Sequence, residues 1–64
     1  MLGAYLRKHR VSKNLTQTRM AERLGTSQSY YCQIERGAKR PGFALTERIA
    51  KELGVEPSFV RGLL

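Results

Sequence analysis

The sequence has little cysteine, little histidine and no long apolar run, and each shortage excludes a class of protein. The single Cys32 cannot form a disulfide within the chain, and with His9 as the only histidine there is no zinc ligand set. No apolar stretch approaches the roughly 18 residues of a membrane span. The basic residues of the opening segment follow a short apolar stretch, which is the reverse of a secretory signal. We therefore expect a protein of a reducing cytoplasm, with no metal, no cofactor, no membrane segment and no small-molecule substrate.

Length and charge favour a small binding domain over an enzyme. A chain of 64 residues is one domain at most, and at this size it buries about 60% of the surface that its unfolded form exposes. We expect residues 1–64 to form a single domain without enzymatic activity, because so short a chain has little room for a catalytic cleft. Residues 1–40 carry nine Lys or Arg and two Glu, whereas residues 41–64 carry three of each, so the whole charge of +7 lies in the first part. This asymmetry suggests nucleic acid or an anionic membrane as the partner, although a solvated surface has the same composition.

Apolar periodicity and helix-end signals predict five helices and no strand. The helices are expected at residues 2–13, 17–24, 28–36, 43–53 and from Pro57 onward. Thr16 and Ser27 suit N-caps, while Asn14 and Gly25 suit the left-handed residue that follows a helix. The predicted fold class is all-α, with short connections and a compact shape.

The third predicted helix has two chemically different sides. Tyr30, Tyr31 and Ile34 fall within about 100° of one another on a helical wheel and mark the buried side. The other side and the helix start carry neutral hydrogen-bonding groups and one cation, namely Gln28, Ser29, Cys32, Gln33 and Arg36. Gln bonds adenine at two positions, Ser bonds several bases, and a small thiol fits against a thymine methyl. These residues therefore suit the base edges of a DNA major groove, while an ordinary polar surface is the alternative interpretation.

The segment TQTRMAERLGTSQSYYCQIERG resembles the helix-turn-helix of the phage repressor and Cro type, often called XRE-like. The signature positions are Gln17, Ala21, Gly25, Tyr31, Ile34, Glu35 and Gly37, with Met20, Leu24 and Ser27 also in place. The flanking matches are Leu6, Arg10 and Leu15 before the segment and Pro41, Ile49, Ala50, Leu53, Gly54 and Val55 after it. The resemblance implies a compact five-helix, lambda-repressor-like domain in which the second and third helices form the helix-turn-helix.

Roles for individual residues follow from the resemblance and the helical wheel together. Base edges would be read by Gln28, Ser29, Gln33 and Cys32. Phosphates would be contacted by Thr16, Gln17, Ser27, Tyr30, Arg36, Lys39 and Arg40. The resemblance also implies a buried ion pair between Arg10 and Glu35 that ties the first helix to the third. For Lys39 and Arg40, solvated loop charge remains an equal alternative.

The remaining candidates lie outside the helix-turn-helix. We interpret His9 as a surface residue rather than a pH switch. The apolar residues of the last helix, Phe59, Val60 and Leu63, complete the core or, with Leu64, form a dimer surface. Because one domain of this size reads few base pairs, we expect a homodimer on DNA, with weak or no dimerisation in solution.

The sequence as a whole predicts a transcriptional regulator, more a repressor than an activator, that binds a short inverted repeat in double-stranded DNA. One alternative is an antitoxin or adaptor whose main role is to bind a partner protein. Another is RNA binding, which the basic charge allows. The narrow major groove of A-form RNA disfavours it, because side chains cannot read that groove.

Overall fold

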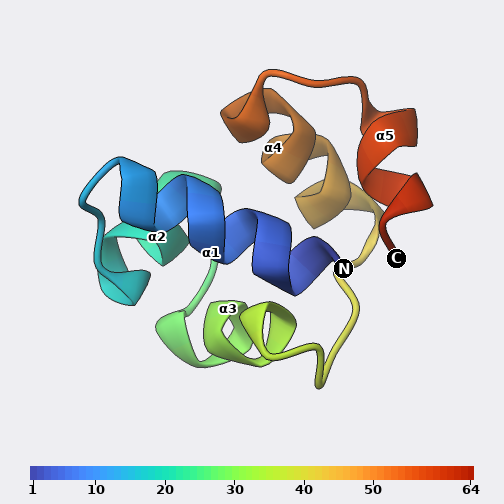
Figure 1. Ribbon diagram of the computed structural model, residues 1–64. Coiled ribbons are helices and arrows are strands. Elements are labelled where there is room, and N and C mark those ends of the chain that lie inside the picture. The colour runs from blue at the N-terminus through green and yellow to red at the C-terminus, as the bar shows by residue number, and fades with distance from the viewer.

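The chain forms five helices and no strand in a computed structural model that describes residues 1–64 (Figure 1). The helices are α1 (Leu2–Ser12), α2 (Gln17–Leu24), α3 (Gln28–Glu35), α4 (Phe43–Leu53) and α5 (Pro57–Gly62). The predicted all-α fold is confirmed, and each predicted helix is present with ends that differ by no more than one residue. None of the five is both long and apolar enough to cross a membrane.

Side-chain caps and left-handed residues fix the ends of α2 and α3. The Thr16 hydroxyl accepts a hydrogen bond from the Arg19 amide at 3.1 Å, and the Ser27 hydroxyl accepts one from the Tyr30 amide at 3.1 Å. Gly25 ends α2 with a φ of 69°, a conformation that a residue without a Cβ adopts at no steric cost. Asn14 follows α1 with a φ of 57°. These local interactions set the turn between α2 and α3.

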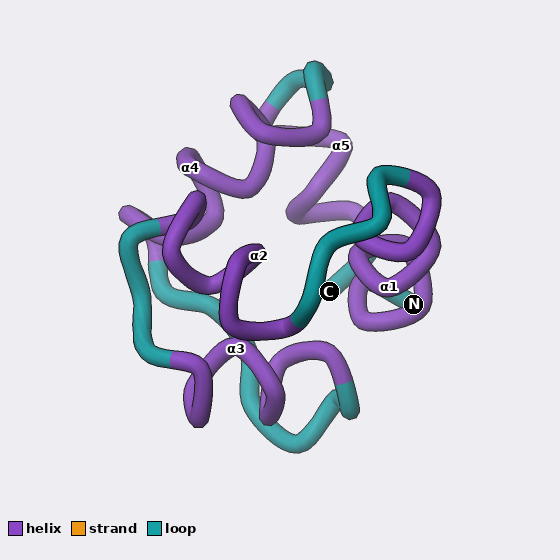
Figure 2. Tube along the Cα trace, turned by 90° about the vertical axis from the view of Figure 1, so that its left-hand side faces the viewer, coloured by secondary structure: helices purple, strands orange, loops and turns teal.

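One apolar core joins all five helices. Its members are Leu2, Leu6, Met20, Ala21, Leu24, Tyr31, Ile34, Leu45, Ile49, Ala50 and Val60. Helix α1 packs against α3, α2 packs against both α3 and α4, and α4 packs against α5. Figures 1 and 2 both place α3 at the lower edge of the molecule and α4 and α5 at the upper part. The outer side of α3 is therefore free of any other helix.

Gly3 lets α1 approach the end of α3 closely. A Cβ at this position would collide with the backbone carbonyl of Glu35. Gly3 is buried although it lies inside a helix, where glycine is usually unfavourable. In the sequence, the only signal for this contact is a glycine within a helical pattern, which does not identify the partner.

The last helix contributes to the core through part of its apolar surface. Val60 is fully buried and Leu63 packs against the core, as expected for core residues. Phe59 remains 42% exposed and meets the ring of Tyr5 edge-on, with ring centroids 5.5 Å apart. Phe59 thus lies at the surface, where it covers the outer side of α1.

Candidate nucleic-acid interface

The outward side chains of α3 are available to a ligand. Gln28 and Ser29 are exposed, and Cys32 and Gln33 are half-buried, whereas Tyr31 and Ile34 lie in the core. Within α3, only Tyr30, Tyr31 and Glu35 engage their side chains in hydrogen bonds inside the protein. The amides of Gln28 and Gln33 therefore keep their full hydrogen-bonding capacity for an external partner.

The carboxylate of Glu35 holds α3 to the two preceding helices. Oε2 accepts hydrogen bonds from Arg10 Nε at 2.9 Å and from the Tyr31 hydroxyl at 2.6 Å. Oε1 accepts from Arg10 Nη2 at 3.0 Å and from Gln17 Nε2 at 3.2 Å. Arg10 also donates from Nη1 to the Leu15 carbonyl at 3.0 Å. The ion pair expected between Arg10 and Glu35 is present and bidentate, with side chains that are 14% and 5% exposed.

Hydrogen bonds keep this cluster in one protonation state. Burial alone would raise the pKa of Glu35, but the bonds from Arg10, Tyr31 and Gln17 outweigh it and lower that pKa. The hydrogen bond to Glu35 raises the pKa of Arg10 despite the opposing effect of burial. Burial, and then the hydrogen bond to Glu35, raises the pKa of Tyr31. The cluster thus holds an ionised carboxylate, a guanidinium and a neutral phenol at ordinary pH.

The network also fixes Gln17, a candidate phosphate contact at the start of α2. The bond to Glu35 uses one amide hydrogen and leaves the other hydrogen and the carbonyl oxygen of this side chain free. Thr16 and Ser27, two further candidates, are exposed but already serve as N-caps. As acceptors of those cap bonds, their hydroxyls still have a hydrogen to donate to a phosphate oxygen.

Tyr30 lies on the packed side of α3, as the helical wheel predicted. Its ring packs against the core, and its hydroxyl donates a hydrogen bond to the Arg40 carbonyl at 3.1 Å. In this conformation the phenol ties the loop of residues 38–42 to α3 instead of presenting its proton to a phosphate. The sequence could not reveal this contact, because it depends on how the loop folds back.

The basic residues divide into those with an ionic partner and those without. Arg19 pairs with Glu22 at 2.9 Å, and Arg23 pairs with Glu52 at 2.8 Å. Exposed cations with no ion pair are Arg7, Lys8, Lys13, Arg36, Lys39, Arg40, Arg48 and Lys51. Three of these, Arg36, Lys39 and Arg40, immediately follow α3 or lie in the loop beyond it. Part of the unpaired positive charge therefore lies directly beside α3.

The interpretation of His9 as a surface residue is wrong. Its Nε2 lies 3.0 Å from Glu52 Oε2, and the two side chains are only 16% and 11% exposed. The pair joins α1 to α4, and Arg23 adds α2 to the same carboxylate. A helical wheel of one helix cannot predict such a contact, because the partner lies 43 residues away in the sequence.

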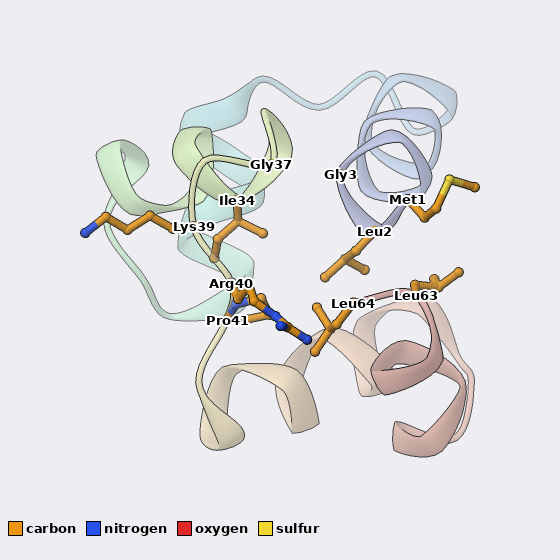
Figure 3. Close-up of a pocket in the computed structure, with 10 residues that line it drawn as sticks. All are labelled: Met1, Leu2, Gly3, Ile34, Gly37, Lys39, Arg40, Pro41, Leu63 and Leu64. Carbon is orange, nitrogen blue, oxygen red and sulfur yellow. The ribbon is translucent and has the colours of Figure 1, made fainter.

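The loop after α3 borders a small pocket of about 240 Å³ (Figure 3). Leu2, Ile34, Pro41, Leu63 and Leu64 give it an apolar lining. Lys39 points away from this pocket, while Arg40 extends across it toward Leu64. Nowhere in the structure do three or more His, Cys or Glu side chains lie close enough to hold a metal ion.

Comparison with protein families gives one match that spans nearly the whole chain. The family model described as "Helix-turn-helix domain" matches residues 1–61. Among curated proteins, the chain is 30% identical to the uncharacterized HTH-type transcriptional regulator YqaF of Bacillus subtilis over 56 residues, which are 88% of this chain and 74% of that protein. An uncharacterized HTH-type transcriptional regulator of Methanothermobacter thermautotrophicus is 39% identical over 51 residues, which are 80% and 74% of the two chains.

A phage protein and a solved structure extend the comparison. The immunity repressor protein of Bacillus phage phi105 is 33% identical over 61 residues. The match covers 95% of this chain and 42% of that repressor. The fold matches the crystal structure of SinR, the master regulator for biofilm formation, in complex with DNA. The TM-score is 0.77 and the identity 26%, over 95% of this chain and 98% of the SinR chain.

Proposed function

The chain belongs to the helix-turn-helix domain family, and from this premise we propose that it is a transcriptional regulator that binds double-stranded DNA. Residues 1–64 act as the DNA-binding unit, in the cytoplasm and without catalytic activity of their own. Helix α3 enters the major groove, where Gln28, Ser29 and Gln33 read base edges and Cys32 lies against an apolar base group. Repression is the favoured sense of regulation, since an immunity repressor is among the relatives.

The single observation that carries this proposal is the free outer side of α3. Its amides have no partner inside the protein, although its other side is fully packed and its last residue is held by Arg10, Gln17 and Tyr31. Cations without ionic partners lie at the end of the helix and in the next loop. A rigid helix with polar groups outward and positive charge beside it suits a groove flanked by phosphates.

We propose further that two copies bind one inverted repeat. A single α3 of eight residues contacts only a few base pairs, which is too few to distinguish one DNA sequence from many others. A second copy, bound about one turn of the DNA helix away, adds the further base contacts. The exposed apolar residues near the chain ends, among them Phe59 and Leu64, are the surface that we assign to this contact.

The test begins with selection of bound sequences from random duplex DNA. An enriched inverted repeat is the expected result. If nothing is enriched, base reading is ruled out and the domain binds protein partners instead. Competition of the selected duplex against duplex RNA should leave the DNA complex intact.

Substitutions then separate base reading from phosphate contact. Gln28→Ala and Gln33→Ala should each weaken binding to the selected duplex by about 1–3 kcal/mol and leave binding to random duplex nearly unchanged. Lys39→Ala is the control, since it removes a proposed phosphate contact that has no ion pair within the protein and should weaken both complexes equally. Equal losses on both duplexes for all three variants would show that α3 does not read sequence.

A further inference from the structure

A basic hollow lies between α2 and α4, and no residue of α3 lines it. It measures about 490 Å³ and is lined only by Arg23, Arg48, Lys51 and Glu52. Helix α2 packs against α3 and against α4, and the hollow lies where the C-terminal half of α4 meets the end of α2. Figures 1 and 2 both show α4 above α2 and α3 below it, and the lining of the hollow comes from α2 and α4 alone.

Two guanidinium groups in the hollow are held in place by the protein itself. Arg48 Nε donates to the carbonyl of Leu24 at 2.8 Å, which satisfies a backbone group at the end of α2. Arg23 donates from Nε to Glu52 Oε1 at 3.2 Å, and its Nη2 lies 2.8 Å from Oε2 of the same carboxylate in an ion pair. Both terminal nitrogens of Arg48 and one of Arg23 remain without a hydrogen-bond acceptor. A guanidinium already fixed through its Nε loses less conformational freedom when its other nitrogens bind a ligand.

The charge of the hollow is not balanced inside the protein. Glu52 is the only acidic side chain in its lining, and it accepts hydrogen bonds from Arg23 and His9. Burial opposes ionisation of Glu52, but those bonds lower its pKa, so this carboxylate is already ionised and satisfied. Arg48 and Lys51 consequently have no carboxylate of their own, and the hollow carries a net positive charge.

From these observations we propose that the hollow binds an acidic segment of a partner protein, with neighbouring carboxylates placed on Arg48 and Lys51. A carboxylate is the ligand that a presented guanidinium binds through two parallel hydrogen bonds. No residue of α3 lines the hollow, so a partner bound there can be held at the same time as a duplex on α3. The proposal rests on the proposed function for the direction of α3, but peptide binding can be measured without DNA.

The test is a titration of ¹⁵N-labelled protein with a tetraglutamate peptide blocked at both ends, at about 0.15 M salt, where exposed charges are screened beyond roughly 8 Å. We expect amide shifts at the end of α2 and in the second half of α4, and none at residues 28–36. A tetraglutamine peptide is the neutral control and should cause no shifts. The same titration, repeated with the protein bound to a selected duplex, should give the same shifts.

Two variants with the same change in charge locate the site. Lys51→Glu should weaken peptide binding about five- to tenfold, whereas Lys8→Glu, an exposed cation on α1, should weaken it less than about twofold. Arg48→Gln should weaken it as well, and its helix content measured by circular dichroism shows whether the Leu24 contact was needed for folding. Equal losses for Lys51→Glu and Lys8→Glu would overturn the proposal, because binding would then follow total charge.

The remaining outcomes also separate this site from the DNA site. If duplex DNA displaces the peptide, the peptide lies on the α3 face and the proposal is wrong. If a second duplex shifts the α2 and α4 amides, the hollow binds nucleic acid and not a protein. If no duplex binds but the peptide does, the proposed function fails while the hollow remains an acidic-peptide site.

Discussion

At the scale of single residues, Gly3 shows how strongly one absent methyl group controls the packing of two helices. Helix propensity alone predicts that Gly3→Ala stabilises α1 by about 1 kcal/mol. We expect the opposite, a loss of about 1–3 kcal/mol in the free energy of unfolding, because the new Cβ meets the Glu35 carbonyl and forces α1 away from α3. Urea unfolding followed by circular dichroism measures the difference.

Gly62 provides the matched control for this substitution. It is the last residue of α5, and a Cβ there would meet no atom within 4 Å. Gly62→Ala should therefore leave stability unchanged or raise it by about 0.4–1 kcal/mol. If both alanine variants stabilise the protein, the close approach of α1 to α3 is not a constraint on the fold.

Residue-level contacts are also where the sequence was least informative. The helical wheel of α3 correctly predicted Tyr31 and Ile34 as buried, because the periodicity of a helix is encoded in its own residues. It could not give the contact of His9 with Glu52, nor the engagement of the Tyr30 hydroxyl by the loop. Both depend on the relative placement of segments distant along the chain, which no local pattern encodes.

At the scale of elements, the N-cap of α3 has a structural role that can be separated from a role in DNA binding. Ser27→Ala should lower the free energy of unfolding by about 1 kcal/mol, since the Tyr30 amide loses its acceptor. Ser27→Asp should keep the cap and the favourable interaction with the helix dipole. It should nevertheless weaken DNA binding, because the added negative charge faces phosphates.

Thermal unfolding and duplex titration of the two variants distinguish these effects. The alanine variant should unfold at a lower temperature, and the aspartate variant should match the parent in stability while binding duplex less tightly. An aspartate variant that binds duplex as well as the parent protein would exclude Ser27 from the phosphate contacts.

Helix positions were predictable because their end signals are local. Thr16, Ser27 and Gly25 act within four residues of themselves, so the α2–turn–α3 unit could be placed before the structure was known. The network around Glu35 was predictable only in part. The resemblance implied the pair with Arg10. The bond from Gln17 depends on how α2 crosses α3, whereas Tyr31 lies one turn before Glu35 in α3 itself, a spacing at which two side chains can meet.

At the scale of the whole molecule, stability should depend on two carboxylates. The pKa values of Glu35 and Glu52 are lowered in the folded state, so the unfolded chain binds protons more readily near pH 4. Their contribution to stability is therefore present above roughly pH 4.3 and is lost as the pH falls through the lower folded-state values. We expect the free energy of unfolding to be nearly constant between about pH 7 and 5 and to decrease steadily below that.

Denaturant titrations at a series of pH values measure this dependence. Glu52→Gln should lower stability at neutral pH and reduce the steepness of the acid decline, because one of the two titrating groups is then absent. A parent protein whose stability stays constant down to about pH 3 would contradict the assignment of these two carboxylates.

The division of α3 into a packed side and a free side has a consequence for how such proteins diverge. The side chains that hold the helix, Tyr31, Ile34 and Glu35, are different from those that point outward, Gln28 and Ser29. Exposed substitutions without internal partners usually change stability by less than about 0.5 kcal/mol. After gene duplication, two copies can accumulate different outward residues while both continue to fold. If these residues read bases as proposed, new DNA targets are reached without passing through unfolded intermediates.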